Sequence, residues 1–158
     1  MNNKISLIIS HIEKLHSCVQ RLVQLSEQKK KLVCERYKVE SLLRIMSSED
    51  LESKSLAKFQ ERITHEMSEL PLINDKELNL SVFSDYLEKR GDSLCDKVRD
   101  LKELINNKIQ VYRENTVFCN MILETESTYY RHILKAIDKS HTYGDGRRQK
   151  INLFNASA

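Results

Sequence analysis

Histidines and carboxylates are the residues of this chain whose chemistry could hold a metal ion. His11 and His16 are five residues apart, which places them about 140° apart around a helix rather than on one face. Glu13 and His16 form a single Glu-x-x-His pair, whereas helical di-iron sites use two such pairs and two further glutamates. The pattern therefore predicts no metal site and no cofactor.

The glycines and cysteines do not indicate an active site either. Gly144 and Gly146 follow an expected helix rather than a strand, and the third glycine of a phosphate-binding loop is missing. The four cysteines form no Cys-x-x-Cys and lie in apolar helical patterns, where a thiol acts as a small hydrophobe. Because no local signature places a base beside a nucleophile, we expect a protein that is not an enzyme.

The composition predicts that long helices position all of these residues. The chain has 158 residues, 40% hydrophobic and 31% charged, with three glycines and one proline. So few turn formers cannot supply a many-stranded sheet, and the composition favours helices and coiled coil. We expect an all-α antiparallel bundle of three long helices with coiled-coil character. Without a signal peptide or an apolar segment of about 18 residues, we expect a cytoplasmic protein with no direct membrane insertion.

Apolar residues at alternating steps of three and four mark the first helix. They are Ile5, Ile8, Ile12, Leu15, Val19 and Leu22, and Leu25 and Leu32 continue the seam with a small drift. The end of this helix is open to two interpretations. A turn within residues 34–40 would give two helices of similar length, whereas the serines and acids of residues 47–50 could cap a helix that starts after Met46. We favour the earlier turn.

The second helix ends near Pro71, and residues 71–80 are expected to form a crossing loop. Its expected apolar face consists of Leu51, Leu56, Phe59, Ile63, Met67 and Leu70. The last helix is expected from Ser81 or Ser84 to about Ser140, with a bend or short break at Gly91.

From residue 94 the last helix has a strict seam with alternating steps of four and three. Its positions are Leu94, Val98, Leu101, Ile105, Lys108, Tyr112, Asn115, Cys119, Ile122, Glu126, Tyr129 and Ile133. A second stripe widens the apolar face and consists of Ile109, Leu123, Tyr130, Leu134 and Ile137. Asn115 and Lys108 interrupt the seam, so they either set the register of the bundle or reach solvent.

Positive charge gathers at the C-terminal end of the chain. The net charge is +3, and residues from 131 onward contribute +4 through six Lys/Arg and two Asp. Such spread cations are mostly solvated and complement a helix C-terminus, so we expect no nucleic-acid partner. We expect a helical domain over residues 1–143 and a flexible basic tail over residues 144–158, because Gly144 and Gly146 supply the backbone freedom of a helix exit.

The chain resembles the FlgN family of flagellar type III export chaperones in two segments. One is similar to the family's pattern of two helices joined by a turn, and its residues are Glu27, Leu32, Leu42, Leu56 and Arg62. The other places a tyrosine before a glycine-containing tail, as the family does, and its residues are Asn115, Ile122, Thr142, Tyr143, Gly144 and Gly146. The chain departs from the family in Tyr129 and Tyr130 and in a shorter tail.

The resemblance implies a small cytoplasmic helical chaperone. Family members bind the C-terminal helical region of hook–filament junction proteins, prevent their premature assembly and deliver them to the membrane export gate. The implied cargo face consists of Val117, Phe118, Ile122, Leu123, Tyr130, Ile133, Leu134 and Ile137. Tyr143, with Gly144 and Gly146, would dock onto the cytoplasmic domain of the export gate.

Two other functions fit the same sequence. One is a structural coiled-coil protein whose long helices bury each other in a homo-oligomer, without a cargo. The other is a nucleic-acid-binding helical bundle that uses the basic tail. An exposed apolar helix face also allows a weak homodimer of the chaperone.

Overall fold

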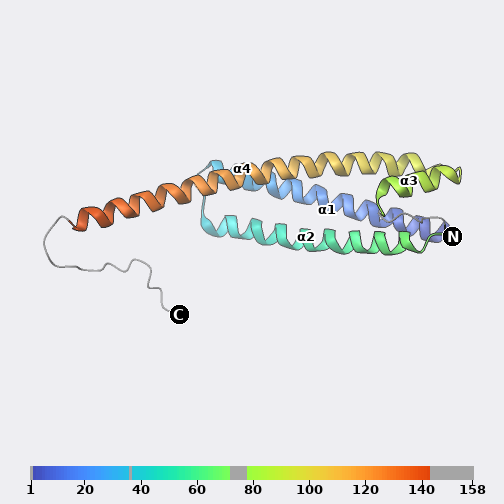
Figure 1. Ribbon diagram of the computed structural model, residues 1–158, viewed down its shortest axis with the longest axis horizontal. Helices are drawn as coiled ribbons and strands as arrows, with labels where there is room; N and C mark the ends of the chain where they lie inside the picture. Colours follow the sequence, from blue (N-terminus) through green and yellow to red (C-terminus); the bar gives the residue numbers. More distant parts are fainter. Residues whose placement is uncertain (1, 36, 72–77, 143–158) are drawn as a thin grey trace, which may run out of the picture. The chain divides into compact units, whose positions relative to one another are not determined.

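The computed structural model describes residues 2–35, 37–71 and 78–142. These residues form the four helices α1 (Asn2–Cys34), α2 (Val39–Ser68), α3 (Leu80–Lys89) and α4 (Leu94–Thr142). The predicted all-α fold is confirmed, and α1, α2 and α4 are the three long helices expected (Figure 1). The short helix α3 is an addition to the predicted three.

The chain divides into two compact units, Met1–Asn120 and Met121–Ala158. The first unit contains α1, α2, α3 and α4 up to Asn120, and the second contains the remainder of α4. The tail expected over residues 144–158 lies outside the described residues, so the predicted division after residue 143 stays a prediction.

The turn between the first two helices lies within residues 34–40, as favoured from the sequence. α1 ends at Cys34 and α2 begins at Val39, so the alternative helix end near Met46 is wrong. Residues 47–50 lie inside α2, where the Ser48 hydroxyl donates to the Arg44 carbonyl at 3.1 Å instead of capping a helix. Glu49 is buried by contact with α1, which fixes this segment within the bundle.

Gly91 separates α3 from α4 and has a φ of +67°, in the left-handed region that glycine adopts at low cost. The Gly91 amide donates to the Glu88 carbonyl and the Asp92 amide donates to the Leu87 carbonyl. These two bonds are the Schellman arrangement that closes a helix C-terminus. The Asp92 carboxylate then accepts the Leu94 amide at 3.1 Å and caps α4. The break predicted at Gly91 is confirmed, and it completes the end of a separate helix.

Asn79 caps the start of α3 by accepting the amides of Ser81 and Val82 at 2.9 and 3.1 Å. The helix buries Phe83, Tyr86 and Leu87. A ten-residue helix is marginal alone, so this packing maintains it. Leu78 and Leu80 also pack against the core, as expected of the crossing segment, while residues 72–77 lie outside the described part.

The apolar core of the first unit draws on all four helices. α1 supplies Ile5, Ile8, Ile9, Ile12, Leu15 and Val19; α2 supplies Ile63 and Met67, with Leu70 just beyond its end; α3 supplies Phe83, Tyr86 and Leu87; and α4 supplies Val98 and Ile105. Because the α2, α3 and α4 members pack against the first half of α1, this core occupies one end of the unit. Leu51, expected on the α2 core face, is instead 65% exposed.

The seam of α1 continues beyond Leu22 without drift. Its next buried positions are Ser26, Lys29 and Val33, which keep the alternating spacing of four and three. Leu25 and Leu32 are only half-buried, so the apolar residues expected to continue the seam lie at its edges. The second half of α1 therefore directs polar side chains toward its neighbours.

Candidate functional site

The second unit carries an exposed apolar face on α4. Every residue from 127 to 138 is exposed, although the sequence repeats apolar residues there at helical spacing. The large apolar members are Tyr129, Tyr130, Ile133, Leu134 and Ile137, which keep between 36% and 64% of their surface exposed. We call these five residues the α4 stripe.

The spacing of the α4 stripe places its members on one side of the helix. Tyr130, Ile133, Leu134 and Ile137 follow an i, i+3, i+4, i+7 pattern. Tyr129 borders this side, and its ring meets that of Tyr130 edge-on with centroids 6.0 Å apart. An apolar side of this width on a helix is what another amphipathic helix packs against.

The charges of this segment lie around the apolar stripe. Arg131 and Lys135 are exposed, and the Arg131 guanidinium donates to the Ser127 hydroxyl at 3.3 Å. Thr128 and His132 are exposed at positions roughly opposite the centre of the stripe, as their helical spacing requires. The segment is therefore amphipathic, with polar side chains on the side opposite the α4 stripe.

Three residues of the predicted cargo face are half-buried rather than exposed. Phe118 is half-buried, and the Lys30 ammonium lies 5.0 Å from the centroid of its ring. This cation–π contact stabilises the packing of α4 against α1. Ile122 and Leu123 are half-buried. Of the eight residues predicted for the cargo face, these three are therefore less exposed to solvent than the members of the α4 stripe.

Val117 does not share a face with the buried seam of α4. It is 69% exposed, and it lies two residues from both Asn115 and Cys119, which are buried. Two residues correspond to about 200° around a helix, so Val117 points away from the seam. Its predicted place in the cargo face is unsupported by the local geometry and stays a prediction.

Asn115 is buried and takes part in a polar layer across α1, α2 and α4. Its amide donates to the Ser26 hydroxyl at 3.0 Å, and Lys29 pairs with Glu49 at 2.9 Å. We call Ser26, Lys29, Glu49 and Asn115 the polar layer. Asn115 does not reach solvent, and a buried asparagine with one matching partner is well suited to fix the helix register. Lys108, the other seam interruption, is half-buried.

The spacing of residues along α1 indicates this polar layer, although the residue types do not. Ser26 and Lys29 stand at the seam spacing that follows Val19 and Leu22. A lysine at such a position normally indicates solvent, and its buried partner Glu49 lies on another helix. The pairing therefore depends on the antiparallel alignment of α1 and α2.

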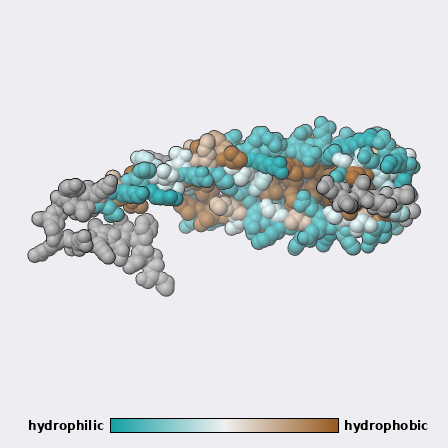
Figure 2. All heavy atoms as spheres, in the orientation of Figure 1, coloured by the Kyte–Doolittle hydropathy of each residue, from teal (hydrophilic) through white to brown (hydrophobic). Residues whose placement is uncertain are grey.

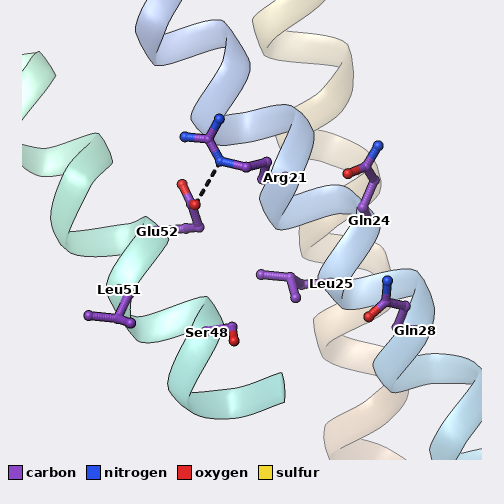
Figure 3. A pocket seen from close by; sticks show the side chains of 7 residues that line it. All are labelled: Arg21, Gln24, Leu25, Gln28, Ser48, Leu51 and Glu52. Carbon is purple, nitrogen blue, oxygen red and sulfur yellow. Dashed lines mark hydrogen bonds and ion pairs between the residues drawn. The ribbon is translucent and has the colours of Figure 1, made fainter. Parts of the chain in front are cut away.

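An open groove between α1 and α2 is a further feature that the sequence did not predict (Figure 3). It is lined by Arg21, Gln24, Leu25, Gln28, Ser48, Leu51 and Glu52. Arg21 and Glu52 point toward one another across it, with 2.6 Å between the guanidinium Nε and a carboxylate oxygen. A second exposed apolar group, Val39, Leu43 and Met46, lies where α2 begins, and Figure 2 shows apolar side chains gathered there.

The titratable residues near α1 make pairs between helices. The His11 ring and Glu66 are 3.1 Å apart, and Lys97 pairs with Glu13 at 2.6 Å. In the described part of the chain, His, Cys, Asp and Glu side chains nowhere gather in threes that could hold a metal ion. The pKa values of the buried Cys18 and Cys119 thiols are raised, mainly because burial penalises the thiolate.

Tyr143, Gly144 and Gly146, the residues that the resemblance assigns to gate docking, lie outside the described residues. Among the described helices, none combines the length and apolar character that crossing a membrane requires. Comparison of the chain with protein-family models, curated protein sequences and solved structures gives no match.

Proposed function

We propose that this protein is a cytoplasmic flagellar export chaperone that binds the C-terminal helical region of hook–filament junction proteins. The observation that carries the proposal is the α4 stripe, five large apolar side chains left exposed on one helical segment. In this role the protein prevents premature assembly of its cargo and delivers it to the type III export gate.

The chemistry of the α4 stripe supports a helical partner. Its i, i+3, i+4, i+7 spacing matches the anchor spacing by which amphipathic helices pack into one another. Tyr129 and Tyr130 add large exposed rings, and tyrosine is enriched among the residues that dominate binding at protein interfaces. A cargo that forms coiled-coil contacts in its own assembly has an apolar helix face that would be complementary to the α4 stripe.

The exposure of this stripe also suits a transient complex. Residues 127–138 are exposed in the free protein, so cargo binding requires no prior unfolding of the first unit. Release likewise leaves the apolar core intact, because the core residues belong to the first unit. The resemblance of the segment from Asn115 to Gly146 to the FlgN family adds a reason to favour this cargo class.

Calorimetry with a purified junction-protein C-terminal segment tests the proposal. Tyr130→Ala with Ile133→Ala removes two members of the α4 stripe and is expected to weaken binding at least tenfold. Thr128→Ala with His132→Ala is the matched control, because these exposed residues lie on the other side of the same helical turns. Equal affinity of both double variants for the cargo would contradict the proposal.

Delivery to the export gate is a separate part of the proposal and rests on Tyr143 with Gly144 and Gly146. We expect Tyr143→Ala to retain cargo affinity and to lose binding to the cytoplasmic domain of the gate in a pull-down. Normal gate binding by this variant would withdraw the role of Tyr143 and leave the cargo proposal standing.

The exposed stripe also favours a second candidate, a structural protein that self-associates through α4 without a cargo. Light scattering over a range of concentrations distinguishes the two. A stable oligomer that Tyr130→Ala with Ile133→Ala dissociates would favour the structural protein. A monomer, or a weak dimer that the cargo displaces, fits the chaperone.

A further inference from the structure

The polar layer crosses the first unit at the point where its apolar core ends. All four members are buried, and each helix of the layer contributes at least one: Ser26 and Lys29 from α1, Glu49 from α2 and Asn115 from α4. The Ser26 hydroxyl donates to the Val23 carbonyl at 2.7 Å and accepts the Asn115 amide. The layer therefore joins α1 to α4 through Ser26 and Asn115, and α1 to α2 through Lys29 and Glu49.

The two sides of this layer differ in apolar burial. On the side of α3, the core cluster extends along α1 as far as Val19 and along α4 as far as Ile105. On the other side, the buried apolar residues among those described are Val33, Leu42 and Cys119. We call this second side the turn end, consisting of the described residues 30–35, 37–46 and 116–120. Val39, Leu43 and Met46 lie in it and remain exposed.

The layer itself holds the helices together less firmly than apolar contacts would. A buried ion pair loses hydration that its attraction roughly offsets, so apolar residues of similar size are often as stabilising or more so. The second oxygen of Glu49 is also buried without a hydrogen-bond partner. Regions with few buried apolar contacts open first in folded proteins.

We propose that the polar layer is a joint at which the turn end opens as one unit while the core side stays folded. Lys29 with Glu49 joins α1 to α2, and Ser26 with Asn115 joins α1 to α4, so separation of either pair leaves buried polar groups without these partners. Because Ser26 and Lys29 lie one helical turn apart on α1, both pairs separate together in this proposal, and their opening exposes Val33, Leu42 and Cys119. The proposed opening at the polar layer does not depend on whether α4 binds a cargo.

Two equally buried cysteines report on the two sides of the layer. Cys18 is 1% exposed beside the core, and Cys119 is 0% exposed in the turn end. Burial raises the pKa of both thiols, and each reacts only when its surroundings open. In the full chain with Cys34→Ser and Cys95→Ser, we expect N-ethylmaleimide to label Cys119 at least tenfold faster than Cys18, with rates normalised to those in denaturant.

Replacement of the ion pair tests the joint directly. Lys29→Met with Glu49→Leu is expected to slow Cys119 labelling at least tenfold and to leave Cys18 unchanged. Lys4→Met with Glu69→Leu is the matched control, because it removes an exposed pair of the same residue types between α1 and the end of α2. That control is expected to leave Cys119 labelling unchanged.

A second variant keeps the test independent of how well the first one folds. Ser26→Ala with Asn115→Leu removes the other contact of the layer and is expected to slow Cys119 labelling in the same direction. Equal labelling rates for Cys18 and Cys119 in the parent chain would overturn the proposal. An unchanged Cys119 rate in the folded layer variants would overturn it as well.

Discussion

Phe83→Ala is expected to cost a large share of the stability of the first unit. Phe83 is fully buried in the core cluster that all four helices form. Truncation of a buried phenylalanine removes its transfer free energy and leaves a cavity, at a typical cost of about 3–5 kcal/mol. Against a total of roughly 5–15 kcal/mol, this loss leaves the fold marginal. The melting temperature should fall by roughly 6–20 °C for a chain of this size.

Urea unfolding followed by circular dichroism at 222 nm measures this loss. Tyr130→Ala is the comparison variant, because Tyr130 is 61% exposed and its truncation should change the free energy of unfolding by less than about 0.5 kcal/mol. A loss below about 1 kcal/mol for Phe83→Ala, with the urea dependence unchanged, would show that α3 does not complete the core.

Three further outcomes follow from local features. Gly91→Ala should destabilise the protein by about 1–2 kcal/mol in thermal unfolding, because its φ is +67° although the site has room for a methyl group. Lys4→Met should raise the pKa of Glu69 in an NMR titration, because the Lys4 hydrogen bond and charge lower it. The stabilisation from this pair is present above the pKa of an unfolded glutamate and is lost as the pH falls through the lower folded-state pKa. N-ethylmaleimide should modify the exposed Cys34 before the buried Cys18, as counted by intact-protein mass.

Most of the fold was predictable because helix spacing repeats strictly along this chain. Alternating steps of three and four identified the core side of α1, and Gly91 marked the break before α4. The turn within residues 34–40 followed from matching helix lengths rather than from any local signal. α3 was missed as a separate helix because its ten residues are maintained by tertiary contacts at Phe83 and Leu87.

Residue type was misleading where polar side chains are buried. Lys29 and Glu49 are typical surface residues, and only the alignment of α1 with α2 brings them together. Leu25 and Leu51 are typical core residues, yet Leu25 is half-buried and Leu51 exposed where they line the groove of Figure 3. Periodicity locates a face, whereas the partner helix decides how much of that face is covered.

The same reasoning explains why the α4 stripe could be predicted only in part. The seam continues through Tyr129 and Ile133 with unchanged spacing, so the sequence does not show where coverage ends. α4 has 49 residues and α1 has 33, about 74 Å and 50 Å of helix, so α1 cannot cover α4 along its whole length.

Hydrogen exchange of the full chain, with and without a junction-protein C-terminal segment, tests the central claim most directly. An exposed helical segment exchanges readily, and a bound partner helix slows it. The proposed function predicts that the cargo protects peptides covering residues 127–138, and that Tyr130→Ala with Ile133→Ala abolishes this protection. Protection confined to the groove between α1 and α2, or none at residues 127–138, would contradict it.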